Sequence, residues 1–122
     1  MNKPETPMNM SELMLMQKNL NARMGDPMGS GEVAIRRNAL ALIKEVTEVL
    51  DEINWKWWKA PEEAKVVDTE KLKSELVDVL QFWTNMVNAA GFSGMDMSDA
   101  YYAKLVVCQK RITEGSTTQG WD

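Results

Sequence analysis

The sequence contains no histidine and a single cysteine, Cys108, among its 122 residues. Without histidine, the chain cannot form a Ser-His-Asp triad, use an imidazole as general base or bind a metal through imidazole. One cysteine cannot form an intrachain disulfide, and it cannot supply the ligands of a structural zinc site. Any catalysis must therefore depend on carboxylates, Lys, Arg, Tyr or a hard metal ion, and we expect a cytoplasmic protein.

Positive charge is also scarce, since 14 Lys and Arg face 18 Asp and Glu, for a net charge of −4. Such a chain lacks the basic stripe that binds nucleic-acid backbones. The longest apolar runs are too short to span a bilayer, and no signal-peptide pattern opens the chain. We therefore expect neither nucleic acid nor membrane as a partner. A chain of this length buries only a modest core, which favours a homodimer or homotetramer.

Hydrophobic periodicity and turn signals predict an all-α domain over residues 11–114, between a flexible arm of residues 1–10 and a flexible tail of residues 115–122. No strand-like alternation of useful length occurs, so the expected fold is an oligomeric four-helix bundle. The expected helices run from about 11–24, 32–53, 68–90 and 98–113.

Polar and glycine residues mark the ends of these expected helices. Ser11 and Asp68 are expected to cap the first and third helices, because their side-chain oxygens can accept from free backbone N–H groups. Gly94 is expected to stop the third helix, together with the glycine three residues before it. Ser98 or Asp99 is then expected to start the fourth helix.

Four acidic residues form two pairs with the same spacing. Glu45 and Glu48 flank the apolar stripe of the second expected helix, and Glu75 and Asp78 flank the same side of the third stripe. Packed antiparallel, two such helices can direct four carboxylates to one point. Oxygen ligands suit Mg²⁺ or Mn²⁺, which compensate the mutual repulsion of carboxylates. The alternative is a solvated acidic face, which is the commoner role of a single pair; Glu52 is expected to be exposed.

Four further features resemble, in chain order, the all-α NTP pyrophosphatase superfamily of MazG-like proteins and dimeric dUTPases. QKNLN at 17–21 is similar to the Q-x-x-L-N element of that family. The two acidic pairs resemble its ExxE…ExxD signature, and WKWWK at 55–59 matches the tryptophan segment of dimeric dUTPases. Tyr102, Lys104 and Arg111 have the spacing of the tyrosine, lysine and arginine in the closing helix of that family. The resemblance covers about residues 13–115, and the compact length is similar to phage enzymes that adjust the nucleotide pool of the host cytoplasm.

This resemblance implies a Mg²⁺-dependent hydrolase that converts a (d)NTP to its monophosphate and pyrophosphate without a covalent intermediate. Glu45, Glu48, Glu75 and Asp78 would bind two or three Mg²⁺ ions per site, for which Mn²⁺ can substitute. Glu45 or Glu48 would also orient the attacking water.

Basic, amide and aromatic residues are the candidates for holding the nucleotide. Basic side chains compensate the charge of a leaving pyrophosphate, and amides offer both a donor and an acceptor to a base edge. The alternative roles are an ordinary solvated base for each Lys or Arg and ordinary helix-surface polarity for each amide. Trp57 and Trp58 are instead expected to pack in the core or in a subunit contact. The phosphate-binding candidates are Lys56, Lys59, Lys104 and Arg111, and the base-binding candidates are Gln17, Asn21 and Trp55.

The preferred base remains open between several alternatives. The tryptophan segment and the element at 17–21 favour dUTP. Leu105 and Cys108 occupy two positions where the closing helix of the family carries asparagine, and this departure favours dGTP, GTP or dCTP. A third reading, from another class, is a catalytically inactive helical interaction module that uses the Met-rich segment 8–24 as its partner surface.

Overall fold

The computed structural model describes residues 2–115, and all regular structure within them is helical. This confirms the predicted all-α class. The tail beyond Gly115, including Trp121, lies outside the described residues. Among the described residues, none of the helices is long and apolar enough to cross a membrane. The elements are α1 (Met10–Arg23), α2 (Gly31–Asp51), a short 3-10 helix η1 (Pro61–Glu63), α3 (Thr69–Ala89) and α4 (Gly94–Thr113).

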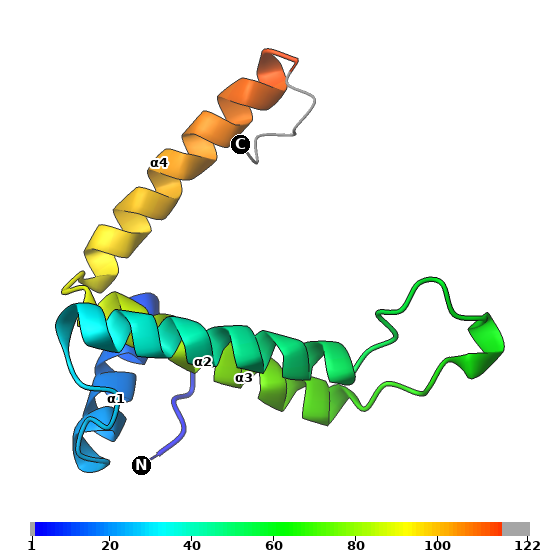
Figure 1. Ribbon diagram of the computed structural model, residues 1–122. Helices are drawn as coiled ribbons and strands as arrows, with labels where there is room; N and C mark the ends of the chain where they lie inside the picture. Colours follow the sequence, from blue (N-terminus) through cyan, green and yellow to red (C-terminus); the bar gives the residue numbers. More distant parts are fainter. Residues whose placement is uncertain (1, 116–122) are drawn as a thin grey trace.

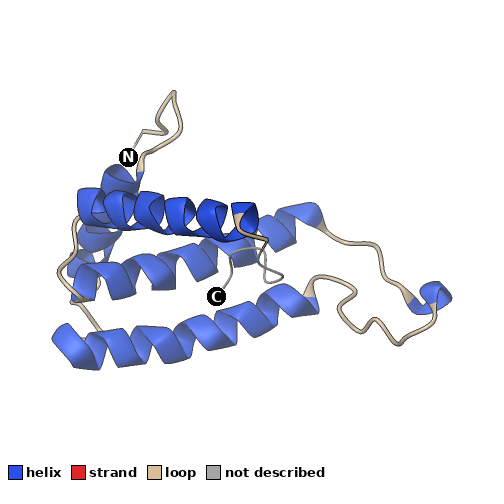
Figure 2. Cartoon of the chain, turned by 90° about the horizontal axis from the view of Figure 1, so that it is seen from above, coloured by secondary structure: helices blue, strands red, loops and turns tan. Residues whose placement is uncertain are grey.

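Helices α2 and α3 form an antiparallel hairpin, and the two lie side by side in both ribbon views (Figures 1 and 2). Asn85 Nδ2 donates to Asn38 Oδ1 at 3.1 Å near one end, and Lys71 Nζ lies 3.3 Å from Glu52 Oε1 near the other. These two contacts are separated by fourteen residues on each helix, which is about four helical turns. The same faces of α2 and α3 therefore oppose each other along the whole hairpin.

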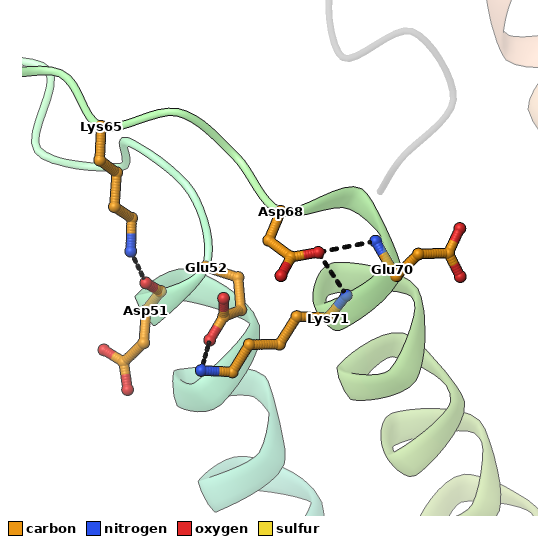
Figure 3. Close-up of polar contacts among 6 residues, drawn as sticks. All are labelled: Asp51, Glu52, Lys65, Asp68, Glu70 and Lys71. Atoms are coloured by element: carbon orange, nitrogen blue, oxygen red, sulfur yellow. Dashed lines mark hydrogen bonds and ion pairs between the residues drawn. The ribbon is translucent and has the colours of Figure 1, made fainter.

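Polar contacts anchor the connection between α2 and α3 where each helix ends (Figure 3). Asp68 caps α3 as expected, because its Oδ1 accepts from two backbone N–H groups of the first turn at 3.1 Å. Lys65 Nζ donates to the backbone carbonyl of Asp51, the last residue of α2. Together with the pairing of Lys71 with Glu52, these contacts close the end of the hairpin, so the loop projects beyond the helices (Figure 1).

The start of α1 differs from the prediction. Asn9, not Ser11, is the N-cap: its side chain accepts from the backbone N–H of Glu12 at 2.9 Å, and the Glu12 carboxylate accepts from the backbone N–H of Asn9 at 3.3 Å. This reciprocal capping box gives two free backbone N–H groups an acceptor at once. Ser11 as N-cap would lack such a reciprocal partner. Ser11 is therefore a residue of the first turn.

The start of α4 also differs, because the helix begins at Gly94, four residues before the expected Ser98. Ser93 and Asp96 form a second capping box, with bonds of 2.8 and 3.0 Å. Gly94 is thus the first residue of α4 and does not break a helix. A Cβ on Gly94 would lie 2.8 Å from the Cα of Ser11, so glycine is required where α4 crosses α1. Among the described residues, α4 contacts no helix other than α1.

The core of a single chain is small: the buried apolar residues in the described part of the chain are Met14, Ala34 and Val87. The accessible surface is 9521 Å², whereas a compact globular protein of this mass exposes about 6,600 Å². Apolar side chains of α2, α3 and α4 remain exposed in consequence. Those more than half exposed include Leu40, Ile43, Leu76, Tyr101 and Tyr102.

Candidate metal and nucleotide site

Three of the four predicted acids meet in the middle of the α2–α3 hairpin. Each of Glu45, Glu48 and Glu75 offers a carboxylate oxygen, and these oxygens lie within 4.8 Å of one another. Asp78 is near enough for its negative charge to raise the pKa of both Glu45 and Glu75. We call Glu45, Glu48 and Glu75 the acid cluster. Their spacing predicted this meeting, because the register of the hairpin brings the two stripes to the same face.

Two members of the acid cluster, Glu45 and Glu75, have raised pKa values. Burial is the largest cause that raises the pKa of Glu45, followed by a hydrogen bond to Glu48 and then by the neighbouring charges. Burial and the same neighbour, Glu48, also raise the pKa of Glu75. Carboxylates that lie this close repel one another, and either a proton or a bound cation relieves that repulsion. The Oε2 atoms of Glu45 and Glu75 are buried, and no described residue bonds to them.

This donor set fits a divalent cation. It consists of carboxylate oxygens alone, which are the ligands preferred by Mg²⁺ and Mn²⁺. Two of its oxygens are buried and have no partner among residues 2–115, and such atoms usually have one in a folded protein.

Glu52 is not exposed as expected, because only 13% of its side chain is accessible. It lies seven residues, or about two turns, after Glu45, so it occupies the same face of α2. There it pairs with Lys71, and this hydrogen bond and charge raise the pKa of the lysine. The pair separates the acid cluster from the loop. Sequence reasoning missed Lys71. The available signal was its position on α3, one heptad before Asp78.

A cavity of about 770 Å³ lies at the other end of the hairpin, between α1, α2 and α3. Both predicted base-binding amides line it, and Gln17 Nε2 donates to Asn21 Oδ1 at 3.0 Å. Four further amides, which sequence reasoning did not single out, share the lining: Asn38, Gln81, Asn85 and Asn88. We call this space the amide cavity.

The amide cavity and the acid cluster lie along one face of the hairpin. Asn38 precedes Glu45 by seven residues on α2, and Asn85 follows Asp78 by seven on α3. Seven residues rise about 10 Å along a helix. This separation is comparable to the length of a nucleoside, so a base in the cavity could direct its phosphates toward the acids.

The tryptophan segment lies in the loop beyond the opposite end of α2. Trp55 and Trp57 contact Trp58 edge to face, with ring centroids 5.6 and 4.9 Å apart. Trp57 is 83% exposed and Trp58 is 60% exposed, so they do not pack in the core of this chain, and their expected alternative, a subunit contact, stays a prediction. Lys56 Nζ lies 5.6 Å from the centroid of the Trp55 ring.

Within one chain, the structure does not bring all predicted site residues together. Trp55, Lys56 and Lys59 line a separate cavity of about 440 Å³ beyond Asp51. Asp51 lies thirteen residues after Asn38, or about 20 Å along α2. Trp55 therefore does not share a cavity with the two base-binding amides.

The two phosphate-binding candidates of α4 are also separate from the acids. Lys104 and Arg111 are two turns apart on one face of α4, which contacts α1 and not the hairpin in the described chain. The Nη1 atom of Arg111 is buried without a hydrogen-bond partner among the described residues. Their proposed contact with phosphate remains a prediction.

Comparison with known families assigns the chain. A family model described as dUTPase matches residues 9–90, which span the acid cluster, the amide cavity and the tryptophan segment but end before α4. Searches among curated proteins and solved structures found no match. The family match covers well over half of the chain and agrees with its all-helical fold, as the resemblance to all-α NTP pyrophosphatases predicted. The chain therefore belongs to the dUTPase family.

Proposed function

We propose that this protein is a Mg²⁺-dependent pyrophosphohydrolase that converts dUTP to dUMP and pyrophosphate. Membership of the dUTPase family supports a nucleotide pyrophosphatase in general. The observation that carries the finer proposal is the acid cluster, where carboxylate oxygens from two helices meet within 4.8 Å and two buried oxygens have no described partner.

Glu45, Glu48 and Glu75 would hold the ions, and Asp78 would add a fourth carboxylate. When bound, Mg²⁺ neutralises phosphate charge and lowers the pKa of a coordinated water. Two or three ions per site fit this number of oxygens, and Mn²⁺ has the same ligand preference. Glu48 raises the pKa of both Glu45 and Glu75, and the oxygens of all three lie within 4.8 Å of one another, so Glu48 is placed to share an ion with either neighbour. Glu45 or Glu48 would also accept a hydrogen bond from the attacking water and orient it.

The base would enter the amide cavity, where Gln17 and Asn21 offer donors and acceptors to its edge. The triphosphate would then run along the hairpin toward the acid cluster. The family assignment favours uracil as the base. The same chemistry on dGTP, GTP or dCTP is the alternative, because Leu105 and Cys108 occupy the asparagine positions of the closing helix. This activity would control the nucleotide pool of the cytoplasm, that of the host if a phage encodes the chain.

We also propose that the enzyme is a homodimer or homotetramer. The chain exposes about 2,900 Å² more than a compact monomer of its mass, whereas an obligate interface buries about 1,000–2,500 Å² on each partner. Trp55, Lys56 and Lys59, and the α4 residues Lys104 and Arg111, would reach a nucleotide at the acid cluster only from another copy. Sedimentation that shows a monomer at micromolar concentration would contradict the oligomer.

Pyrophosphate release tests the activity. The assay uses Mg²⁺ and eight substrates: the four common dNTPs, dUTP, dITP, GTP and ATP. We expect dUTP to dominate and Glu48→Gln to reduce kcat by about 1,000-fold, because it removes a ligand at the centre of the acid cluster. Glu62→Gln, which changes an exposed acid of η1, is the control and should retain activity. If no nucleotide turns over with Mg²⁺ or Mn²⁺, the inactive interaction module becomes the better account.

A further inference from the structure

Four side-chain amides form a continuous hydrogen-bonded chain from α1 through α3 to α2. Gln17 Nε2 donates to Asn21 Oδ1 at 3.0 Å, and Asn21 Nδ2 donates to Asn85 Oδ1 at 2.8 Å. Asn85 Nδ2 donates in turn to Asn38 Oδ1 at 3.1 Å. We call this chain the amide relay. It runs along the wall of the amide cavity, because all four residues line that space.

The relay has a fixed direction, and its inner end sets it. Asn38 is 2% exposed, and its Nδ2 donates to the backbone carbonyl of Ala34 at 2.8 Å. A carbonyl oxygen can only accept, so the nitrogen of Asn38 must face it and the oxygen must face Asn85. The same reasoning then fixes Asn85, Asn21 and Gln17 in turn. Reversing any internal amide would place oxygen against oxygen or nitrogen against nitrogen on both sides.

The relay thereby determines what the cavity offers to a ligand. Among the described residues, no hydrogen bond reaches Gln17 Oε1, so the outer end of the relay is a free acceptor. The amide nitrogens of Asn21 and Asn85 each use one hydrogen within the relay and keep a second. The order of donors and acceptors that the four relay amides offer to the cavity is therefore constant. An isolated asparagine or glutamine amide could turn over and present the opposite order.

We propose that Asn38 and Asn85 are positioning residues that fix the orientation of Asn21 and Gln17, and that they thereby enforce a choice between uracil and cytosine in the base site. This inference rests on the proposed function, because it takes the amide cavity as the base site. At positions 3 and 4, uracil carries a donor and an acceptor where cytosine carries an acceptor and a donor. A wall of fixed order can match one of these edges, whereas a wall of freely turning amides matches both.

The test replaces the inner half of the relay. The double variant Asn38→Leu/Asn85→Leu removes both partners of one bond, which is less disruptive than leaving one buried amide unpaired. It retains Gln17 and Asn21 but frees them to turn over. Asn88→Leu is the matched control, since Asn88 lines the same cavity but donates to the backbone carbonyl of Met14 and lies outside the relay. If the double variant does not fold, Asn85→Ser at a half-buried position takes its place.

The measurement is binding of dUMP and dCMP by NMR titration, since neither monophosphate can be hydrolysed to pyrophosphate. We expect the wild-type protein to prefer dUMP over dCMP by about tenfold. The two affinities should come within about threefold in the double variant and remain apart in Asn88→Leu. The side-chain amide signals of Gln17 and Asn21 should shift in the double variant only, which reports the relay without any ligand.

Four results would overturn the inference. They are a wild-type protein that binds neither monophosphate or binds both equally, selectivity that survives in the double variant, equal loss of selectivity in Asn88→Leu, and unchanged Gln17 and Asn21 signals in the double variant. The proposed function fails separately. Selective binding without pyrophosphate release would sink the catalytic proposal alone, whereas release with unchanged selectivity in the double variant would sink the relay alone.

Discussion

The acid cluster and the amide relay occupy one face of the same hairpin, two turns apart, yet they differ in how their polar groups are satisfied. Asn38, 2% exposed, both donates and accepts within the chain. Glu45 and Glu75 each retain a buried oxygen without a described partner. Neutral amides can satisfy one another because each carries a donor and an acceptor, whereas carboxylates carry only acceptors and one sign of charge. The internal amides of the relay are therefore satisfied within the chain, whereas the cluster keeps buried acceptors that no described residue satisfies and that we propose a cation satisfies.

The largest effect on stability is expected from breaking the relay at its buried end. Asn38→Ala removes two hydrogen bonds and leaves the amide nitrogen of Asn85 without its acceptor at the buried end of the relay. We expect a loss of about 2–3 kcal/mol in the free energy of unfolding, measured by urea denaturation. Asn88→Ala should cost less, because one bond is lost. Equal losses would contradict the special place of Asn38.

Adding the cation should complete the cluster and stabilise the fold. Mg²⁺ at about 100 times its Kd contributes about 2.7 kcal/mol if it binds only the folded state, which corresponds to a rise in Tm of about 10 °C. Glu48→Gln should abolish most of this rise, whereas Asn88→Ala should retain it. Differential scanning fluorimetry measures both. A rise that is equal in wild type and Glu48→Gln would place the ion elsewhere.

Removing one charge from the metal-free cluster should have the opposite effect to removing one from an ordinary ion pair. The pKa of Glu45 is raised, mainly by burial and by Glu48, so the folded state holds its proton more tightly than the unfolded chain. The metal-free protein should gain stability as the pH falls from neutral through this raised pKa toward 4.5. Glu45→Gln should raise the metal-free Tm at pH 7 by a few degrees and flatten this part of the profile. A lower Tm in Glu45→Gln would show that the cluster is compensated within the chain.

The smallest effect on stability is expected at Asp96, whose carboxylate accepts a hydrogen bond from the backbone N–H of Ser93. The backbone N–H and the side chain of Ser93 lower its pKa from 3.8. The Asp96 carboxylate contributes to the stability of the folded state at pH values above its unfolded pKa, and this contribution is lost as the pH falls through the lowered folded pKa. The pH dependence is opposite in sign to that of Glu45, which destabilises the folded state at neutral pH. Asp96→Asn should therefore lower Tm slightly at pH 7 and have less effect near pH 3. A larger difference at pH 3 than at pH 7 would contradict this capping role.

The sequence was sufficient to predict α2, α3 and the acid cluster. The bounds of both helices agree with the expectation within two residues, because long amphipathic stripes with a clear cap at Asp68 dominate local preference. The equal spacing of the two acidic pairs translates directly into proximity once the helices pair antiparallel. The starts of α1 and α4 were misplaced because both are set by reciprocal capping boxes, at Asn9 and Ser93, rather than by the nearest serine.

The remaining features depend on contacts that local patterns do not report. An amide relay across three helices has no signature in a single helix, since Asn38 and Asn85 look like ordinary polar residues there. Gly94 was read as a helix breaker because its role depends on the distant Ser11. The exposed Trp57 and Trp58 could not be placed from sequence, and the base-stacking role of Trp55 stays a prediction.

The most direct test of the central claim is a Mn²⁺ titration followed by electron paramagnetic resonance, in which bound Mn²⁺ loses the signal of the free ion. The account predicts at least one tight site per chain in the wild-type protein, its loss in Glu48→Gln, and its retention in Asn38→Leu/Asn85→Leu. This result would show that the carboxylates, and not the amides two turns away, need a cation for completion. Equal binding by wild type and Glu48→Gln, or no binding by either, would contradict the assignment of the acid cluster as the metal site.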